Sequence, residues 1–261
     1  MKKVGIIGAG KIGGSLLLRL AESGGFELGA SDIHPEQLRS YQSVGVRTTS
    51  SNRELAETSD LVIAAVKPWD VAQVMEEISP SFGDNNKAVA SVAAGVSIER
   101  ISESLPQGTA ILRVMPNVCA SVGLGSAVVT ANEAGRATLP MVMDIFRHVG
   151  DVQELPERLF DAATALHGSG PAYVALFADA LIQAGVREGI PRDVARRLVI
   201  GTIGGTAVLL KERSAHQVRD EVMTPGGTTA AAFVAMEKAG FVAAVYDGVE
   251  AATERARGLG G

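Results

Sequence analysis

The sequence predicts an α/β protein in which a doubly wound parallel sheet is followed by an all-helical domain. Three observations lead to this fold class. Short β-branched runs alternate with helical stretches over the first 155 residues, strand-like runs stop after about residue 156, and a glycine-rich turn joins the first strand to the first helix. Such alternation is typical of parallel strands covered by helices on both faces. We therefore expect two domains, residues 1–155 and 156–261.

The expected strands are nearly continuous apolar runs, which is the pattern of strands buried on both faces of a sheet. They are residues 3–8, 26–32, 60–66, 87–92, 109–114, 126–130 and a short one near 151–155. Helices are expected between them, with Pro35, Pro68 and Pro80 at helix edges, where a missing N–H does no harm. The expected helices are residues 12–23, 35–43, 52–58, 70–78, 97–104 and 134–148.

The second half of the chain has a helical pattern throughout. Its expected helices are residues 158–188, 191–212, 215–222, 226–238 and 241–257, with an interruption at 168–171 in the first of them. Alanine and glycine are frequent here and large side chains are few. A helical piece of roughly 105 residues with so little apolar volume would be marginal alone. We therefore expect it to pair with a second subunit as a dimerisation domain.

Composition excludes several classes of partner. The chain has 261 residues, of which 46% are apolar and 20% are charged, as in an ordinary soluble globular protein. A net charge of −5 and an aromatic content of 4% disfavour a nucleic-acid or anionic-membrane partner. The longest uncharged run, residues 114–132, contains proline, asparagine and glycine, so it cannot span a bilayer as a regular helix.

The single Cys119 excludes an intramolecular disulfide and a cysteine-based metal cluster. The four histidines lack the spacing of a zinc site. These observations are typical of a protein of the reducing cytoplasm, and we expect a cytoplasmic protein without a metal site and without a membrane segment.

The glycine-rich turn has the spacing of a dinucleotide-binding motif. It reads Gly8-Ala9-Gly10-Lys11-Ile12-Gly13 and follows the first expected strand directly. The first glycine allows a tight turn, the second lets a diphosphate approach the backbone, and the third permits close helix–sheet packing. The N-terminus of the following helix offers free N–H groups to phosphate. The motif therefore predicts a Rossmann-type domain that binds NAD or NADP.

The choice between the two cofactors depends on the end of the second strand. Asp32, 19 positions after the last glycine of the motif, would accept hydrogen bonds from the adenosine ribose and repel a 2′-phosphate, which favours NAD(H). If Asp32 turns away, a polar nest would take its place: Ser31, His34, Asn52 and Arg53. Because these features act in opposite directions, we expect either reduced cofactor to work.

Three further segments resemble one enzyme family. Ala65-Val66-Lys67-Pro68 ends the strand at 60–66, and Ser169-Gly170-Pro171-Ala172-Tyr173 opens the helical half. Val222-Met223-Thr224-Pro225-Gly226-Gly227-Thr228-Thr229 lies near its end. With the glycine-rich motif, these segments resemble pyrroline-5-carboxylate reductase over the full length of the chain, and the Pro-Gly-Gly-x-Thr part is the most specific.

The resemblance implies an oxidoreductase that reduces 1-pyrroline-5-carboxylate to L-proline, the last step of proline biosynthesis, with hydride from reduced NADP or NAD. It also implies a homodimer, which can assemble further into a ring of dimers. The cofactor contacts that it implies are Gly8, Ala9, Gly10, Lys11, Ile12, Asn52, Ala65, Val66, Lys67, Pro68, Ala93, Ala94 and Gly95. To these the second strand adds Ser31 and Asp32. The implied substrate-binding residues are Thr224, Pro225, Gly226, Gly227, Thr228 and Thr229.

The substrate segment has suitable chemistry for an imine acid. Pro225-Gly226-Gly227 precedes a helix, whose N-terminal N–H groups can hold the substrate carboxylate. The hydroxyl of Thr229 can then be directed at the ring nitrogen, which must be protonated or strongly hydrogen-bonded to accept hydride at the adjacent carbon. Thr229 is therefore the expected catalytic residue.

The chain departs from the family pattern in two places. The family usually reads Met-Pro-Asn-Thr-Pro, whereas Met115-Pro116-Asn117 is followed here by Val118-Cys119. The family usually reads Leu-Ser-Gly-Ser-Gly-Pro, and here His167 replaces the first serine. His167 could add a polar group near the pocket, but the favoured interpretation is a histidine with its hydrogen bonds satisfied at a helix break.

Three alternative functions share parts of this pattern. A β-hydroxyacid dehydrogenase would use a lysine base after the Rossmann domain, but the chain has no lysine between Lys87 and Lys211. A related imine reductase of broader scope stays open. A dinucleotide-sensing binding protein would carry a degenerate substrate segment, whereas Thr224–Thr229 is intact.

Overall fold

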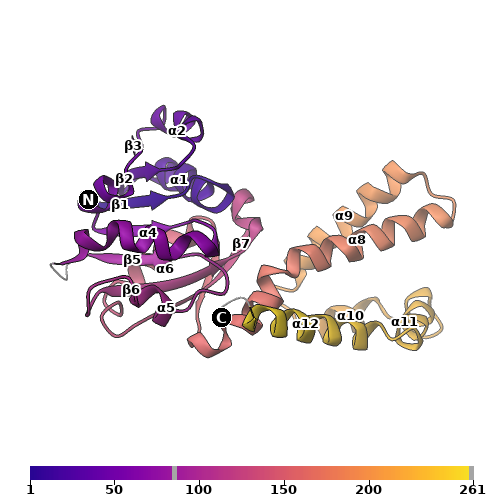
Figure 1. Cartoon of the computed structure of the whole chain (residues 1–261). Coiled ribbons are helices and arrows are strands. Elements are labelled where there is room, and N and C mark those ends of the chain that lie inside the picture. The colour runs from indigo at the N-terminus through magenta and orange to yellow at the C-terminus, as the bar shows by residue number, and fades with distance from the viewer. Residues whose placement is uncertain (84–86, 259–261) are drawn as a thin grey trace. The chain divides into compact units, whose positions relative to one another are not determined.

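The computed structural model describes residues 1–83 and 87–258 and is drawn in Figure 1. It forms two compact units. The first unit is Met1–Ser169 together with the residues from Ala251 onward, and the second is Gly170–Glu250. Each unit is described by itself.

An eight-stranded sheet forms the centre of the first unit, in the order β3-β2-β1-β4-β5-β6-β7-β8. Its strands are β1 (Lys2–Ile7), β2 (Phe26–Ser31), β3 (Arg47–Thr49), β4 (Leu61–Ala64), β5 (Ala88–Ser91), β6 (Ala110–Pro116), β7 (Gly125–Ala131) and β8 (Gly150–Glu154). Every predicted strand is present. The short edge strand β3 was not predicted, because three residues are too few to show an alternating pattern.

The direction of the last two strands differs from the prediction of a parallel sheet. The strands from β1 to β6 are parallel to their neighbours, but β7 runs antiparallel to β6, and β8 is parallel to β7. Only the short 3-10 helix η3 (Val118–Val122) lies between β6 and β7. A parallel crossover needs about a dozen residues or more, so this connection forces the chain to turn back.

Helices cover both faces of the sheet, which confirms the predicted doubly wound fold (Figure 1). They are α1 (Lys11–Ser23), α2 (Pro35–Gln42), α3 (Asn52–Glu57), α4 (Val71–Ile78), α5 (Ile98–Ser102) and α6 (Leu139–Arg147), with the 3-10 helices η1 (Pro68–Asp70) and η2 (Ser79–Phe82). Leu16 and Phe146 belong to one core cluster, and Leu55 and Ile78 belong to the other. Helix α6 begins five residues later than expected, because turns occupy the residues before it.

The segment after the sheet stays with the first unit. It contains η4 (Glu157–Leu159), α7 (Phe160–Ala163) and a π-helix, η5 (Thr164–Gly168). Arg113 on β6 is 5% exposed; its Nη1 lies 3.1 Å from Glu157 Oε1, and its guanidinium covers the buried Phe160 ring. This packing extends the compact unit beyond residue 155. The domain boundary at 155/156 stays a prediction, and residues 259–261 of the predicted second domain lie outside the described residues.

The second unit consists of helices α8 (Gly170–Arg187), α9 (Arg192–Leu209), α10 (Ala215–Val222), α11 (Thr228–Lys238) and most of α12 (Phe241–Arg257). The break predicted at 168–171 falls at the start of α8. Within Gly170–Glu250, Ala195 is the only buried apolar residue, whereas Leu176 is 72% exposed and Tyr246 is 71% exposed. The unit therefore has almost no core of its own.

No single helix in the described ranges is long and apolar enough to cross a bilayer. Helices α11 and α12 have the length and apolar composition of a membrane span only when they are taken together, and the chain bends by 51° at the break between them.

Candidate functional site

The glycine-rich turn between β1 and α1 needs glycine for steric reasons. Gly8 has a φ of +94°, and a Cβ there would lie 2.6 Å from the carbonyl oxygen of Ala65. A Cβ on Gly13 would overlap the carbonyl oxygen of Gly8. Gly10 is the N-cap of α1 and no side chain caps that helix. The first N–H groups of α1 are thus placed at the carboxyl edge of the sheet.

A pocket of about 820 Å³ lies at this edge, beyond the ends of β1, β2, β4 and β5. Its lining includes most of the predicted cofactor residues: Gly8, Gly10, Lys11, Ile12, Asp32, Asn52, Ala65, Val66, Lys67, Pro68, Ala93 and Ala94. Ala9, Ser31 and Gly95 do not line it, and the first two are buried. The pocket also has lining residues that the sequence did not predict: Ile7, Ile33, Gln37, Asp70, Gln73, Val74, Glu77 and Val92.

Asp32 connects the glycine-rich turn to the loop before α2. Its Oδ2 accepts a hydrogen bond from the Ala9 N–H at 2.7 Å, and its Oδ1 accepts one from the His34 N–H at 2.8 Å. Each carboxylate oxygen has a further lone pair, so these bonds leave acceptor capacity toward the pocket. Burial, and secondly the Asp32 carboxylate, raise the pKa of the Tyr41 phenol above its ordinary value. Tyr41 therefore stays neutral at physiological pH beside Asp32.

Ser31, Asn52 and Glu77 form a hydrogen-bonded chain along one wall of the pocket. The buried Ser31 Oγ donates to Asn52 Oδ1 at 2.7 Å, and Asn52 Nδ2 donates to Glu77 Oε2 at 2.9 Å. Ser31 thus reaches the pocket only through Asn52. Of the polar group that could replace Asp32, His34 and Asn52 line the pocket. Arg53 is exposed and does not line it.

The pocket carries charges of both signs. Asp32, Asp70 and Glu77 contribute carboxylates, and Lys11 and Lys67 contribute exposed ammonium groups. Within residues 1–83 and 87–258, neither lysine is paired with a carboxylate. The free N–H groups of α1 and these two lysines together suit a diphosphate.

The predicted substrate segment forms a tight turn in the second unit. The Gly227 N–H donates to the Thr224 carbonyl oxygen at 3.0 Å, and Gly226 has a φ of +68°, which favours glycine. Gly227 is the N-cap of α11 and no side chain caps that helix. The first-turn N–H groups, including that of the half-buried Thr229, have no acceptor within the helix and can bind an anion.

The two segments that depart from the family pattern are hydrogen-bonded to each other at the π-helix η5. Nδ1 of His167 lies 2.6 Å from the Ala163 carbonyl oxygen, and Nε2 lies 2.8 Å from the Met115 carbonyl oxygen. Asn117 Nδ2 donates to the carbonyl oxygen of His167 at 3.1 Å, and Asn117 Oδ1 accepts from the Cys119 N–H. Both ring nitrogens of His167 therefore face backbone carbonyl oxygens at the helix break, and the nitrogen that carries the proton donates a hydrogen bond there.

Two family models match the chain. One is described as pyrroline-5-carboxylate reductase dimerisation and matches residues 157–259, and the other is described as NADP oxidoreductase, coenzyme F420-dependent, and matches residues 3–95. Pyrroline-5-carboxylate reductase from Synechocystis is 40% identical over 99% of this chain and 98% of its own length.

Solved structures of the same family superpose over nearly all of the chain. The pyrroline-5-carboxylate reductase from Coxiella burnetii matches with a TM-score of 0.94 at 31% identity, over 99% of this chain and 98% of the other. The enzyme from Plasmodium falciparum, solved with NADP bound, matches with a TM-score of 0.88 at 33% identity, over 100% and 98%. The resemblance inferred from the motifs is confirmed, and the chain belongs to the pyrroline-5-carboxylate reductase family.

Proposed function

We propose that the chain reduces 1-pyrroline-5-carboxylate to L-proline with hydride from NADPH or NADH, as the last step of proline biosynthesis. The full-length family match carries this proposal. Two features of the structure support it, namely a pocket at the carboxyl edge of the sheet and a glycine turn that opens α11.

A reduced nicotinamide dinucleotide, when bound, supplies the hydride for this reaction. The glycine-rich turn at Gly8–Ile12 and the N-terminus of α1 fit its diphosphate. Gly8 and Gly10 line the pocket without a side chain, so a diphosphate can approach the backbone there. Asp32 and the Ser31–Asn52 pair would hold the adenosine ribose. The remaining contacts that we propose are Ala65, Val66, Lys67, Pro68, Ala93, Ala94 and Gly95.

In the second unit, the turn Thr224–Gly227 and the N–H groups of Thr228 and Thr229 would hold the substrate carboxylate. The Thr229 hydroxyl would hydrogen-bond to the ring nitrogen. A five-membered imine acid suits this arrangement, because its carboxylate and its nitrogen are attached to the same carbon. Polarising the nitrogen makes the imine carbon a better hydride acceptor, and this is the role that we propose for Thr229.

A turnover assay tests the proposal directly. Purified chain, 1-pyrroline-5-carboxylate and reduced cofactor should consume the cofactor and form proline in equal amounts. A dinucleotide-sensing protein would bind cofactor without turnover. A broader imine reductase would reduce a six-membered imine acid equally well, and a β-hydroxyacid dehydrogenase would instead oxidise a hydroxy acid.

Replacing Thr229 by alanine should lower kcat/KM by roughly 10- to 100-fold, because a hydrogen bond to a charged partner contributes about 1.5–3 kcal/mol and each 1.36 kcal/mol is tenfold. Activity should persist, since proximity and hydride transfer remain. Thr228→Ala is the matched control: its exposed side chain is lost while its N–H is kept, so its kinetics should change little. Wild-type kinetics in Thr229→Ala would remove this residue from the mechanism.

Replacing Asp32 by alanine should raise the relative use of NADPH, because a negative charge beside the ribose is lost. The same change removes the acceptor of two backbone N–H groups, so affinity for both cofactors should fall and the ratio of the two kcat/KM values is the informative readout. Asp32→Asn, which keeps one acceptor, should shift the ratio with a smaller loss of affinity. An unchanged ratio in both variants would show that Asp32 does not face the ribose.

We also propose that the chain works as a homodimer in the cytoplasm, with dimers that assemble further into a ring. The exposed apolar residues of the helical unit support the dimer. The single cysteine fits a reducing compartment. The net charge of −5 supports the absence of a nucleic-acid or anionic-membrane partner.

A further inference from the structure

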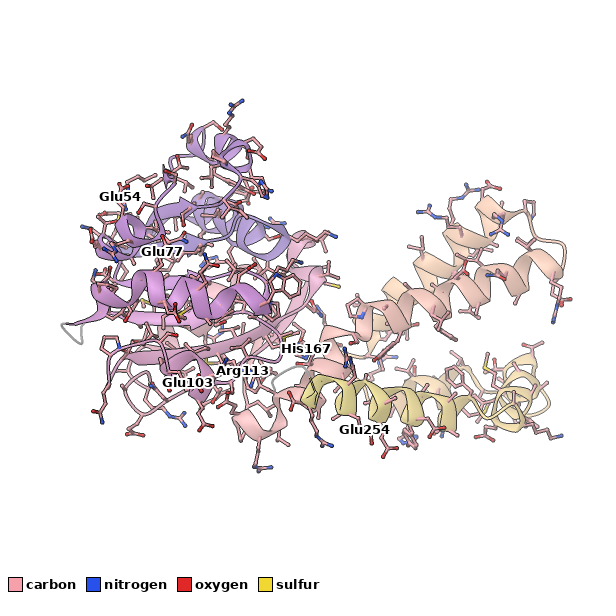
Figure 2. All side chains as sticks on the ribbon, viewed as in Figure 1. Glu54, Glu77, Glu103, Arg113, His167 and Glu254 are labelled. Atoms are coloured by element: carbon pink, nitrogen blue, oxygen red, sulfur yellow. The ribbon has the colours of Figure 1, made fainter. Side chains whose placement is uncertain are left out.

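Glu77 is one of the pocket-lining residues that the sequence did not predict. It lies on α4, where the sequence shows only an amphipathic helix with a polar pair, Glu76 and Glu77. Glu76 is exposed and does not line the pocket. Glu77, which is labelled in Figure 2, is half-buried and lines it. Two adjacent residues of the same charge therefore have different surroundings.

Hydrogen bonds hold the Glu77 carboxylate near the ribose end of the pocket. Asn52 Nδ2 donates to Glu77 Oε2, and Asn52 Oδ1 accepts from Ser31 Oγ. Ser31 directly precedes Asp32, the residue that a Rossmann-type site uses to bind the ribose hydroxyls. The hydrogen-bonded chain from Ser31 to Glu77 therefore places a second carboxylate near the end of β2, which Asp32 directly follows.

The carboxylates of Asp32 and Glu77 would repel the 2′-phosphate of a dinucleotide whose ribose lies at the end of β2. The Asn52 amide carries two N–H donors that a 2′-phosphate could use, and Glu77 accepts a hydrogen bond from one of them. In the described ranges, no lysine, arginine or histidine forms an ion pair with Glu77 or Asp32. A like charge in a partly buried pocket is screened less than in bulk water, so its repulsion persists at physiological ionic strength.

We propose that Glu77 is a specificity-determining residue that disfavours a 2′-phosphate, by its charge and by occupying one of the two N–H donors of the Asn52 amide, so that NAD(H) binds more tightly than NADP(H). This inference rests on the proposed function, since it assumes that a nicotinamide dinucleotide is the ligand of the pocket. It adds a second carboxylate to the effect of Asp32.

Calorimetric titration of the full-length chain with NAD⁺ and with NADP⁺ tests the proposal without turnover. In Glu77→Gln, the dissociation constant for NADP⁺ should fall about tenfold, which corresponds to about 1.4 kcal/mol, while that for NAD⁺ stays within about twofold. The ratio of kcat/KM for NADPH to that for NADH should rise by the same factor. Glu76→Gln is the matched control: it makes the same charge change one residue away and should alter neither constant.

Glu77→Ala removes the carboxylate without offering a new donor, and it should shift the ratio in the same direction if charge is the cause. A folded Glu77→Gln or Glu77→Ala protein with the wild-type preference would overturn the proposal, and so would an equal shift in Glu76→Gln. A wild-type chain that binds both dinucleotides but does not reduce the imine would contradict the proposed function while leaving this inference testable. A wild-type chain that binds neither dinucleotide would overturn both.

Discussion

Gly13→Ala should destabilise the first unit by about 3 kcal/mol and remove measurable cofactor binding. The new methyl group would overlap the carbonyl oxygen of Gly8, which is backbone and cannot rotate away, and it would also crowd the Cβ of Ala65 at 3.1 Å. Overpacking of this kind typically costs about 1–3 kcal/mol, and more where neither neighbour can move. The helix α1 would be pushed from the sheet, and with it the N–H groups that form one side of the pocket. Thermal melting without cofactor and calorimetry with NAD⁺ measure the two effects.

Gly10→Ala separates folding from binding. Gly10 has a φ of −69°, which alanine adopts readily, and no atom lies within 4 Å of a Cβ built there. Stability without cofactor should therefore stay within about 0.5 kcal/mol of the wild type. Because Gly10 lines the pocket, its new methyl group should still weaken cofactor binding. A Gly13→Ala protein that melts like the wild type would contradict the close helix–sheet packing described above.

Leu176→Asp should dissociate the proposed homodimer and abolish most of the activity. Leu176 is 72% exposed on α8, in a unit with almost no core and in the region that matches the dimerisation family model. If it packs against a second subunit, an unpaired carboxylate buried there costs several kcal/mol. A loss of about 3 kcal/mol weakens association by more than 100-fold. Light scattering coupled to gel filtration should then report a particle of 27.0 kDa, the mass of one chain.

Leu124→Asp is the control for this substitution. Leu124 is 76% exposed but lies in the first unit, outside the match to the dimerisation model, so the same change should leave the oligomeric state unaltered. A Leu176→Asp monomer with full activity would contradict the proposal that the chain works as a homodimer. A wild-type chain that is already monomeric and fully active would contradict the dimer itself.

Most elements of the fold could be predicted from the sequence because their signals are local. The buried strands appear as apolar runs, and helix edges carry proline at Pro35 and Pro68. The antiparallel direction of β7 was missed, although the connection between β6 and β7 is too short for a parallel crossover and this length can be read from the sequence.

The candidate site also contains some residues that the sequence could identify and one that it could not. Gly8, Gly10 and Gly13 could be assigned from their spacing, because Gly8 and Gly13 meet steric requirements of the turn and Gly10 leaves the pocket free of a side chain. Glu77 could not be assigned, since Glu76 and Glu77 look alike on an amphipathic helix.

The sequence alone determined the Rossmann-type motif, the order of the elements, the helical second half and the family resemblance, all of which rest on patterns within short segments. Only the tertiary structure decided which polar side chains meet. Ser31 and Asn52 are 21 residues apart, and Asn52 and Glu77 are 25 residues apart. Their hydrogen bonds depend on how the parallel strands bring the end of β2 and the helices α3 and α4 together at one edge of the sheet. That arrangement arises from packing over the whole domain, which no local pattern encodes.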